Sequence, residues 1–136
     1  MNHVKSPVVR FLPAILWMVI IFFVSHQPSA VIPKYGSWDT LLKKGGHVFA
    51  YAVLAILLQY AGLSSRWAFF LAVLYAISDE LHQTQIAGRN GQPMDVAIDT
   101  VGIVIGVLVF HRLGALLRES GWGRRGMVDE QSPRDV

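Results

Sequence analysis

The stretch from Ser78 to Asp99 constrains the fold more than any other, because it places charged side chains between two apolar runs. It holds four acids, one His and one Arg within 22 residues, whereas only 15% of the chain is charged and 53% is hydrophobic. The run before it, Trp67–Ile77, has 11 residues, and the run after it, Val96–Phe110, has 15. A membrane-spanning helix needs about 20 residues. We therefore expect both helices to carry part of the polar stretch, with their polar ends at or inside the membrane boundary.

Two further apolar helices are expected nearer the N-terminus. The first covers Val8–Val24, which is apolar except for Arg10. It ends at Ser25–Pro28, because the residue before a proline is biased away from helix. A cleaved signal peptide has the same outline, but a retained helix fits the apolar chain behind it better. The second helix is expected over about Gly46–Leu63, after a loop at Ser29–Lys44.

The third helix is expected to start near Trp67, after a hinge at Gly62–Arg66 whose two serines can cap it. The mean hydropathy of +0.43 is too high for an ordinary soluble domain. We therefore predict an all-α integral membrane four-helix bundle over residues 1–117. The tail over 118–136 is rich in Gly, Arg and acids, and we expect it to be disordered and cytoplasmic.

Composition excludes several classes of site and partner. The chain has no Cys, so disulfides, thiolate metal sites and Cys nucleophiles are excluded. Its net charge of +3 is better explained by basic residues that flank membrane helices than by nucleic-acid binding. The expected partner is the lipid bilayer, and no nucleic acid is expected.

Orientation follows from the distribution of Lys and Arg, which are enriched on the cytoplasmic side of membrane proteins. With the N-terminus inside, eight basic residues are cytoplasmic, namely Lys5, Arg10, Arg66, Arg112, Arg118, Arg124, Arg125 and Arg134. Four lie outside, namely Lys34, Lys43, Lys44 and Arg89. This predicts a multi-pass cell-membrane protein with both termini inside. The polar end then opens on the extracytoplasmic side.

Helical geometry places the polar residues of the third helix on one face. At about 100° per residue, Ser78, Asp79 and His82 lie within one arc of about 100°, and Gln83 lies about 40° further round. On the second helix, Lys44 and His47 share an arc with Tyr51 if that helix begins early enough. The Gly45-Gly46 pair leaves its start open.

The fourth helix carries a stripe of acids and glycines. Asp95, Asp99, Gly102 and Gly106 lie within about 60° of one another. Gly-x-x-x-Gly lets another helix approach closely, so the acids should face a helix rather than lipid. An Asp at the bilayer centre costs about 2.5–3.5 kcal/mol on insertion scales, and such residues are functional-site candidates by default.

Three motifs resemble the VanZ-like membrane proteins. They are Lys44-Gly-Gly-His-Val-Phe-Ala-Tyr51, Ser78-Asp-Glu-Leu-His-Gln83, and Gly88-Arg89 followed by Asp95 and Thr100-Val-Gly102; Ser25–Pro28 is similar to the family's end of helix one. The resemblance covers about residues 11–110. His26, Ala87 and Asp99 depart from the family's usual Ser, Pro and Asn. The resemblance implies an integral membrane protein, a link to glycopeptide (teicoplanin) resistance through the founding member, and no settled reaction.

Three hypotheses about function follow. In the first, an outward-facing pocket binds a lipid-linked or peptidoglycan-related ligand. Lys44 and Arg89 would hold its phosphate or carboxylate, and the residues that orient it would be Asp79, Glu80, His82, Gln83 and Asp95, joined by His47, Tyr51 and Asp99. The alternative interpretation is that Arg89 is a simple ion-pair partner of Asp95 or Asp79.

The second hypothesis is a membrane-embedded hydrolase or transferase. Asp79 or Glu80 would be its general base, and His82 or His47 the proton partner. The third is a structural subunit of an envelope complex, with a partner helix docked on Gly102 and Gly106. We expect no cofactor, since no His-Glu-x-x-His pattern is present. The alternative is a divalent metal ion held by ligands drawn from His47, His82, Asp79, Glu80 and Asp95.

Overall fold

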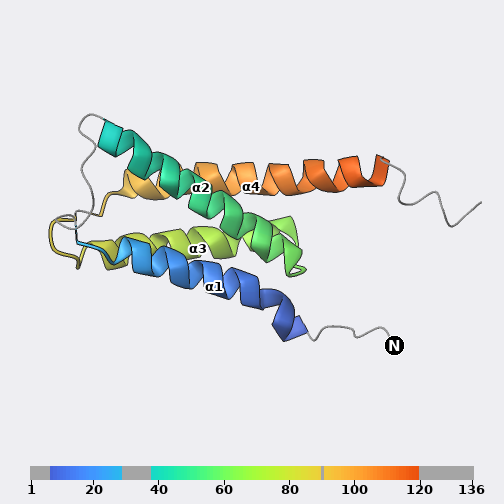
Figure 1. Ribbon diagram of the computed structural model, residues 1–136, viewed down its shortest axis with the longest axis horizontal. Helices are drawn as coiled ribbons and strands as arrows, with labels where there is room; N and C mark the ends of the chain where they lie inside the picture. Colours follow the sequence, from blue (N-terminus) through green and yellow to red (C-terminus); the bar gives the residue numbers. More distant parts are fainter. Residues whose placement is uncertain (1–6, 29–37, 90, 120–136) are drawn as a thin grey trace, which may run out of the picture.

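The computed structural model contains four α-helices, and it describes residues 7–28, 38–89 and 91–119. The helices are α1 (Pro7–Ser25), α2 (Asp39–Tyr60), α3 (Ser65–Gln83) and α4 (Pro93–Glu119) (Figure 1). No strand occurs in those ranges. The all-α prediction is confirmed.

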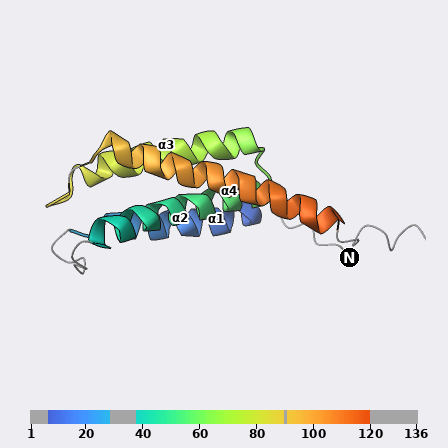
Figure 2. The same cartoon turned by 90° about the horizontal axis from the view of Figure 1, so that it is seen from above.

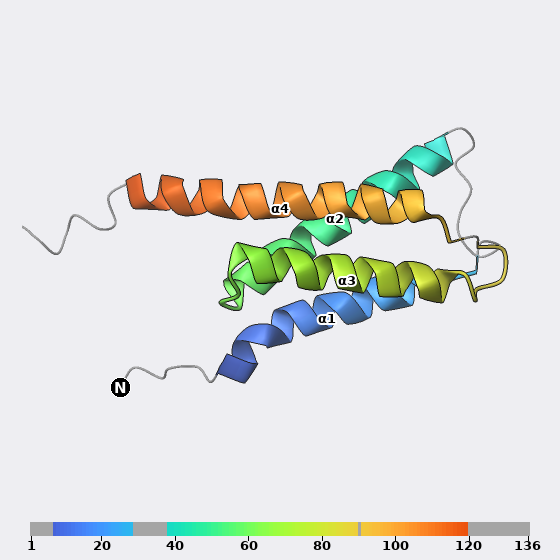
Figure 3. The same ribbon diagram turned by 180° about the vertical axis from the view of Figure 1, so that it is seen from behind.

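The helices form two layers that share one polar end. Figure 2 shows α1 and α2 in one layer and α3 and α4 in the other. The ends of α1 and α3 and the starts of α2 and α4 all lie at the same end of the molecule. At the opposite end, α4 extends beyond the other three helices (Figure 3). The topology thus gathers the polar segments that the sequence analysis singled out.

Helix α2 begins earlier than predicted. Asp39–Lys44 was assigned to a loop, but these residues are helical, and the helix runs through Gly45 and Gly46. An acid in the first turn favours a helix start, and Asp39 pairs with Lys43 at 2.7 Å across one turn. The early start meets the condition for placing Lys44, His47 and Tyr51 on one arc. The preceding residues 29–37 lie outside the described residues.

The later boundaries also differ in detail. α2 ends at Tyr60 rather than Leu63, before Gly62 at φ 106°. Ser64 stands at the N-cap of α3, but its side chain makes no capping hydrogen bond. α4 continues through Arg118 and Glu119, which were assigned to a disordered tail. The rest of that tail, 120–136, lies outside the described residues.

Among the described residues, three helices are long and apolar enough to cross a membrane: α1, α2 and α4. α3 does not meet this criterion over its described length, because polar residues occupy its last turns. Large apolar side chains such as Leu16, Phe70 and Leu108 are exposed on outward faces. This pattern supports a multi-pass membrane protein.

The closest helix packing is between α2 and α4. A Cβ added at Gly102 would overlap the Val48 carbonyl oxygen, and one added at Gly106 would overlap that of Ala52. The predicted glycine stripe therefore packs against a helix of the same chain. This close approach sets His47 opposite Asp99.

Candidate functional site

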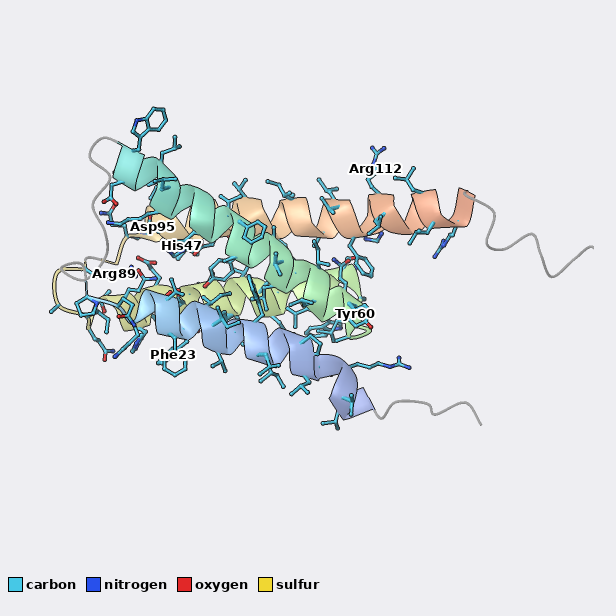
Figure 4. The ribbon with its side chains drawn as sticks, viewed as in Figure 1. Phe23, His47, Tyr60, Arg89, Asp95 and Arg112 are labelled. Atoms are coloured by element: carbon cyan, nitrogen blue, oxygen red, sulfur yellow. The ribbon has the colours of Figure 1, made fainter. Side chains whose placement is uncertain are left out.

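The polar residues gather at the shared end of the helices. In Figure 4 His47, Asp95 and Arg89 lie at that end, whereas Tyr60 and Arg112 lie toward the other. The residues come from all four helices and from the α3–α4 connection. They form two hydrogen-bonded groups, one centred on Asp79 and one on Asp99.

Asp79 is the centre of the first group. It is only 3% exposed, and its Oδ2 accepts hydrogen bonds from Ser25 Oγ (2.8 Å), Gln83 Nε2 (3.0 Å) and Tyr51 OH (3.4 Å). Gln83 follows one turn after Asp79 on α3, whereas Ser25 and Tyr51 come from α1 and α2. One carboxylate thus joins three helices.

Arg89 extends this group from the α3–α4 connection. Its Nη1 donates to Gln83 Oε1 (2.9 Å) and to the Ser25 carbonyl oxygen (3.0 Å). No ion pair between Arg89 and Asp79 or Asp95 is formed in the structure. Arg89 is therefore held by these two hydrogen bonds and not by a simple ion pair. Arg89 is thus linked to Asp79 through Gln83 and Ser25, which each hydrogen-bond to both residues.

The second group is a His–Asp pair. His47 Nδ1 lies 3.0 Å from Asp99 Oδ1, and Asp99 is 1% exposed. The His47 ring stacks on Tyr51, with centroids 6.4 Å apart. In the neutral ring with its proton on Nδ1, Nδ1 donates to Asp99 and Nε2 is a hydrogen-bond acceptor.

Three carboxylate oxygens at this end are buried and have no hydrogen-bond partner among the described residues. They are Asp79 Oδ1, Asp99 Oδ2 and Glu80 Oε2. A buried acceptor without a donor costs about 1–3 kcal/mol. The described residues at this end therefore provide too few hydrogen-bond donors for its carboxylates.

A comparison with models of protein families identifies the family of the chain. The sequence model of the VanZ/LLP1 family matches residues 11–117. The chain belongs to this VanZ family. The resemblance read from its motifs is confirmed. Comparisons with curated proteins and with solved structures found no match.

The VanZ motifs account for most of both groups. The Ser78–Gln83 motif supplies Asp79 and Gln83, and the Gly-Arg motif supplies Arg89. The Lys44–Tyr51 motif supplies His47 and Tyr51. The structure thus brings together six of the predicted residues, namely Asp79, Gln83, Arg89, Tyr51, His47 and Asp99.

Four predicted residues lie apart from these bonds. Glu80 accepts from the Gln92 backbone N–H (2.6 Å) on a different face of α3. His82 Nε2 lies 3.0 Å from His26 Nδ1, and both rings stack with Phe22. The remaining two, the exposed Lys44 and the half-buried Asp95, make no side-chain hydrogen bond with the described residues.

Sequence reasoning missed Ser25 as part of the site. It donates to Asp79 by its hydroxyl and accepts from Arg89 by its carbonyl. The available signal was its place in the Ser25–Pro28 motif. His26, the next residue of that motif, also lies at this end, beside His82.

No group of three or more His, Asp or Glu side chains is arranged to hold a metal ion within the described parts of the chain. Asp79, Glu80 and Asp99 make hydrogen bonds with different partners instead of converging on one point. That the chain needs no cofactor stays a prediction.

Proposed function

We propose that this VanZ-family protein binds a cell-envelope ligand at an outward-facing polar site. The observation that carries the proposal is the set of buried carboxylate oxygens without donors at one end of apolar helices. Ionisable residues inside a membrane are costly and commonly mark binding or transport sites. A ligand with hydroxyl, amide or amine donors would satisfy the free oxygens of Asp79 and Asp99.

The same end offers a cation for an acidic ligand group. Arg89 is fixed through Nη1 on Gln83 and Ser25, so its guanidinium is positioned before any ligand arrives. A guanidinium suits phosphate and carboxylate because both can accept two parallel hydrogen bonds. Donor-rich and anionic groups occur together in lipid-linked and peptidoglycan-related molecules. An effect on glycopeptide susceptibility belongs to this proposal through the family's link to teicoplanin.

The proposed orientation places both termini in the cytoplasm and the site outside. The excess of basic residues on the opposite side, eight against four, supports it. Because the chain has no Cys, Arg89→Cys gives a single-thiol protein for labelling in intact cells. We expect a membrane-impermeant thiol reagent to label position 89 from outside. Labelling only after the cytoplasmic side is opened would contradict the orientation.

A hydrolase or transferase acting on a lipid-linked substrate is the second candidate function, and the His47–Asp99 pair favours it. A carboxylate on Nδ1 holds an imidazole so that Nε2 can accept a proton from a nucleophile. His47 is partly exposed, whereas Asp79 is buried and accepts three hydrogen bonds. His47 is therefore a better general base here than Asp79.

Incubation of purified protein with a labelled lipid-linked peptidoglycan precursor separates these two candidates. Recovery of the bound precursor unchanged supports the binding protein. Conversion by wild type but not by His47→Gln supports the enzyme.

A structural subunit of an envelope complex is the remaining alternative. A partner helix on the Gly102 and Gly106 face would have to displace α2, which occupies that face within the chain. Such a partner would therefore need another surface. Stable Asp79→Asn protein that loses ligand binding would argue against a purely structural role.

A further inference from the structure

A groove lies between α3 and α4, which form one layer of the molecule (Figure 2). Its volume is about 400 Å³, within the range of small-molecule sites. The lining residues that matter here are Ile77, Glu80, Leu81, Gln92, Pro93 and Val96. It is distinct from the hydrogen-bonded group around Asp79, because adjacent residues on a helix point about 100° apart.

Glu80 is the one acid in the lining of this groove. It is 7% exposed, and its Oε1 accepts a hydrogen bond from the Gln92 backbone N–H at 2.6 Å. Its Oε2 is buried and has no partner among the described residues. Glu80 lines the groove, and the terminal torsion of a Glu side chain is soft, so rotation of the carboxylate can bring an oxygen to the groove without movement of the helix; the same rotation moves Oε1 relative to the Gln92 N–H.

The charges near Glu80 favour the binding of a cation by its carboxylate. Within the described residues no Lys, Arg or His forms an ion pair with Glu80. Asp95 and Asp99 add negative potential at its position, and His47 adds a smaller positive one. A buried carboxylate is stabilised best by a charged donor that both neutralises it and hydrogen-bonds to it. A primary ammonium group fulfils both conditions.

The walls of the groove indicate what carries that ammonium. Ile77 and Leu81 are 41% and 62% exposed on the outward face of α3, next to the groove. In a membrane such a surface meets acyl chains. The groove therefore joins an apolar, lipid-facing wall to a buried acid that has one free oxygen.

We propose that this groove binds one membrane lipid whose head group carries a primary ammonium. The ammonium donates to Glu80, and the acyl chains lie along Ile77, Leu81 and Val96. The site goes beyond the envelope-ligand proposal, because it uses neither Asp79 nor Arg89. It discriminates by hydrogen-bond donors, since a trimethylated choline is equally cationic but has no N–H.

The test is native mass spectrometry of the full-length protein, purified in detergent and titrated with three lipids of identical acyl chains. The lipids are phosphatidylethanolamine, phosphatidylcholine and phosphatidylglycerol. We expect wild type to retain the ethanolamine lipid at about tenfold lower concentration than either other lipid. Glycerophosphoethanolamine, which has the head group without acyl chains, should not compete at these concentrations.

Two variants and one control complete the test. Glu80→Gln should make the retention of the three lipids nearly equal. The same acid-to-amide change at Asp39, which pairs with Lys43 on α2 and does not line the groove, should leave the preference intact. Val96→Phe fills the groove without changing charge and should also reduce ethanolamine-lipid binding.

Equal retention of the three lipids by wild type would overturn the inference. So would a preference that survives Glu80→Gln and Val96→Phe, or effective competition by the chain-free head group. None of these results depends on whether a peptidoglycan precursor binds.

Discussion

Replacing Gly102 or Gly106 by Ala tests the helix contact that positions the site. An added Cβ would overlap the backbone carbonyl oxygen of Val48 or Ala52. Backbone atoms cannot rotate away as a side chain can, so α2 and α4 must move apart. Overpacking of this kind costs about 1–3 kcal/mol. The helix preference of Ala over Gly offsets about 0.5–1 kcal/mol of this, so the free energy of unfolding of each variant should fall by about 0.5–2 kcal/mol.

The double variant should lose less free energy of unfolding than the two single variants lose together, because separation of the helices at one glycine makes room at the next. The matched control is Gly114→Ala on the same helix, where an added Cβ meets nothing within 4 Å. It should be as stable as wild type or slightly more stable.

Unfolding of purified protein in mixed micelles of increasing denaturing-detergent content measures these differences. Stabilities of Gly102→Ala and Gly106→Ala that match Gly114→Ala would refute the close α2–α4 packing. They would also remove the reason for placing His47 against Asp99.

Three further variants test the hydrogen bonds of the site. Ser25→Ala removes a buried donor to Asp79 and should lower the free energy of unfolding by about 1–3 kcal/mol; an unchanged value would mean that this bond is absent. Arg89→Lys should fold like wild type but fail to restore glycopeptide protection at matched membrane levels, because it lacks the planar fork; equal protection would defeat the ligand role of Arg89. A double-mutant cycle of His47→Phe and Asp99→Asn should give a coupling of about 0.5–3 kcal/mol in unfolding experiments, and additive effects would exclude the pair.

Much of this fold was predictable from local patterns. The apolar runs and the proline after Ser25 place α1 close to its observed bounds. The apolar runs on either side of Ser78–Asp99 are too short to span a membrane alone. This predicts that the neighbouring polar residues belong to the same helices, as observed for α3 and α4. Gly102 and Gly106 predict the close approach because glycine spacing is a local property. The start of α2 was predicted too late because the Gly45-Gly46 pair left it open, whereas the helix begins at Asp39, whose side chain pairs with Lys43 across the first turn.

The site was less predictable, because its partners are distant in sequence. Asp79 and Gln83 are one turn apart, so their contact follows from helix geometry. Ser25 and Asp79 are separated by 54 residues, and only the relative placement of α1 and α3 brings them together. Glu80 was grouped with Asp79 by sequence proximity, but the helix turns it toward Gln92. The role of Arg89 was open because its partners are a side-chain amide and a backbone carbonyl, which no charge pattern reveals.

Ligand binding by the polar end is the central claim, and an equilibrium binding measurement tests it most directly. The probe is a fluorescent lipid-linked peptidoglycan precursor, titrated with purified wild type, Asp79→Asn and Asp39→Asn in the same detergent. Both variants replace one acid by its amide, but only Asp79 belongs to the site. We predict that wild type and Asp39→Asn bind alike, and that Asp79→Asn binds at least about tenfold more weakly while remaining folded, as expected for loss of a charge-assisted hydrogen-bond acceptor. Equal binding by folded Asp79→Asn and wild type would contradict the claim.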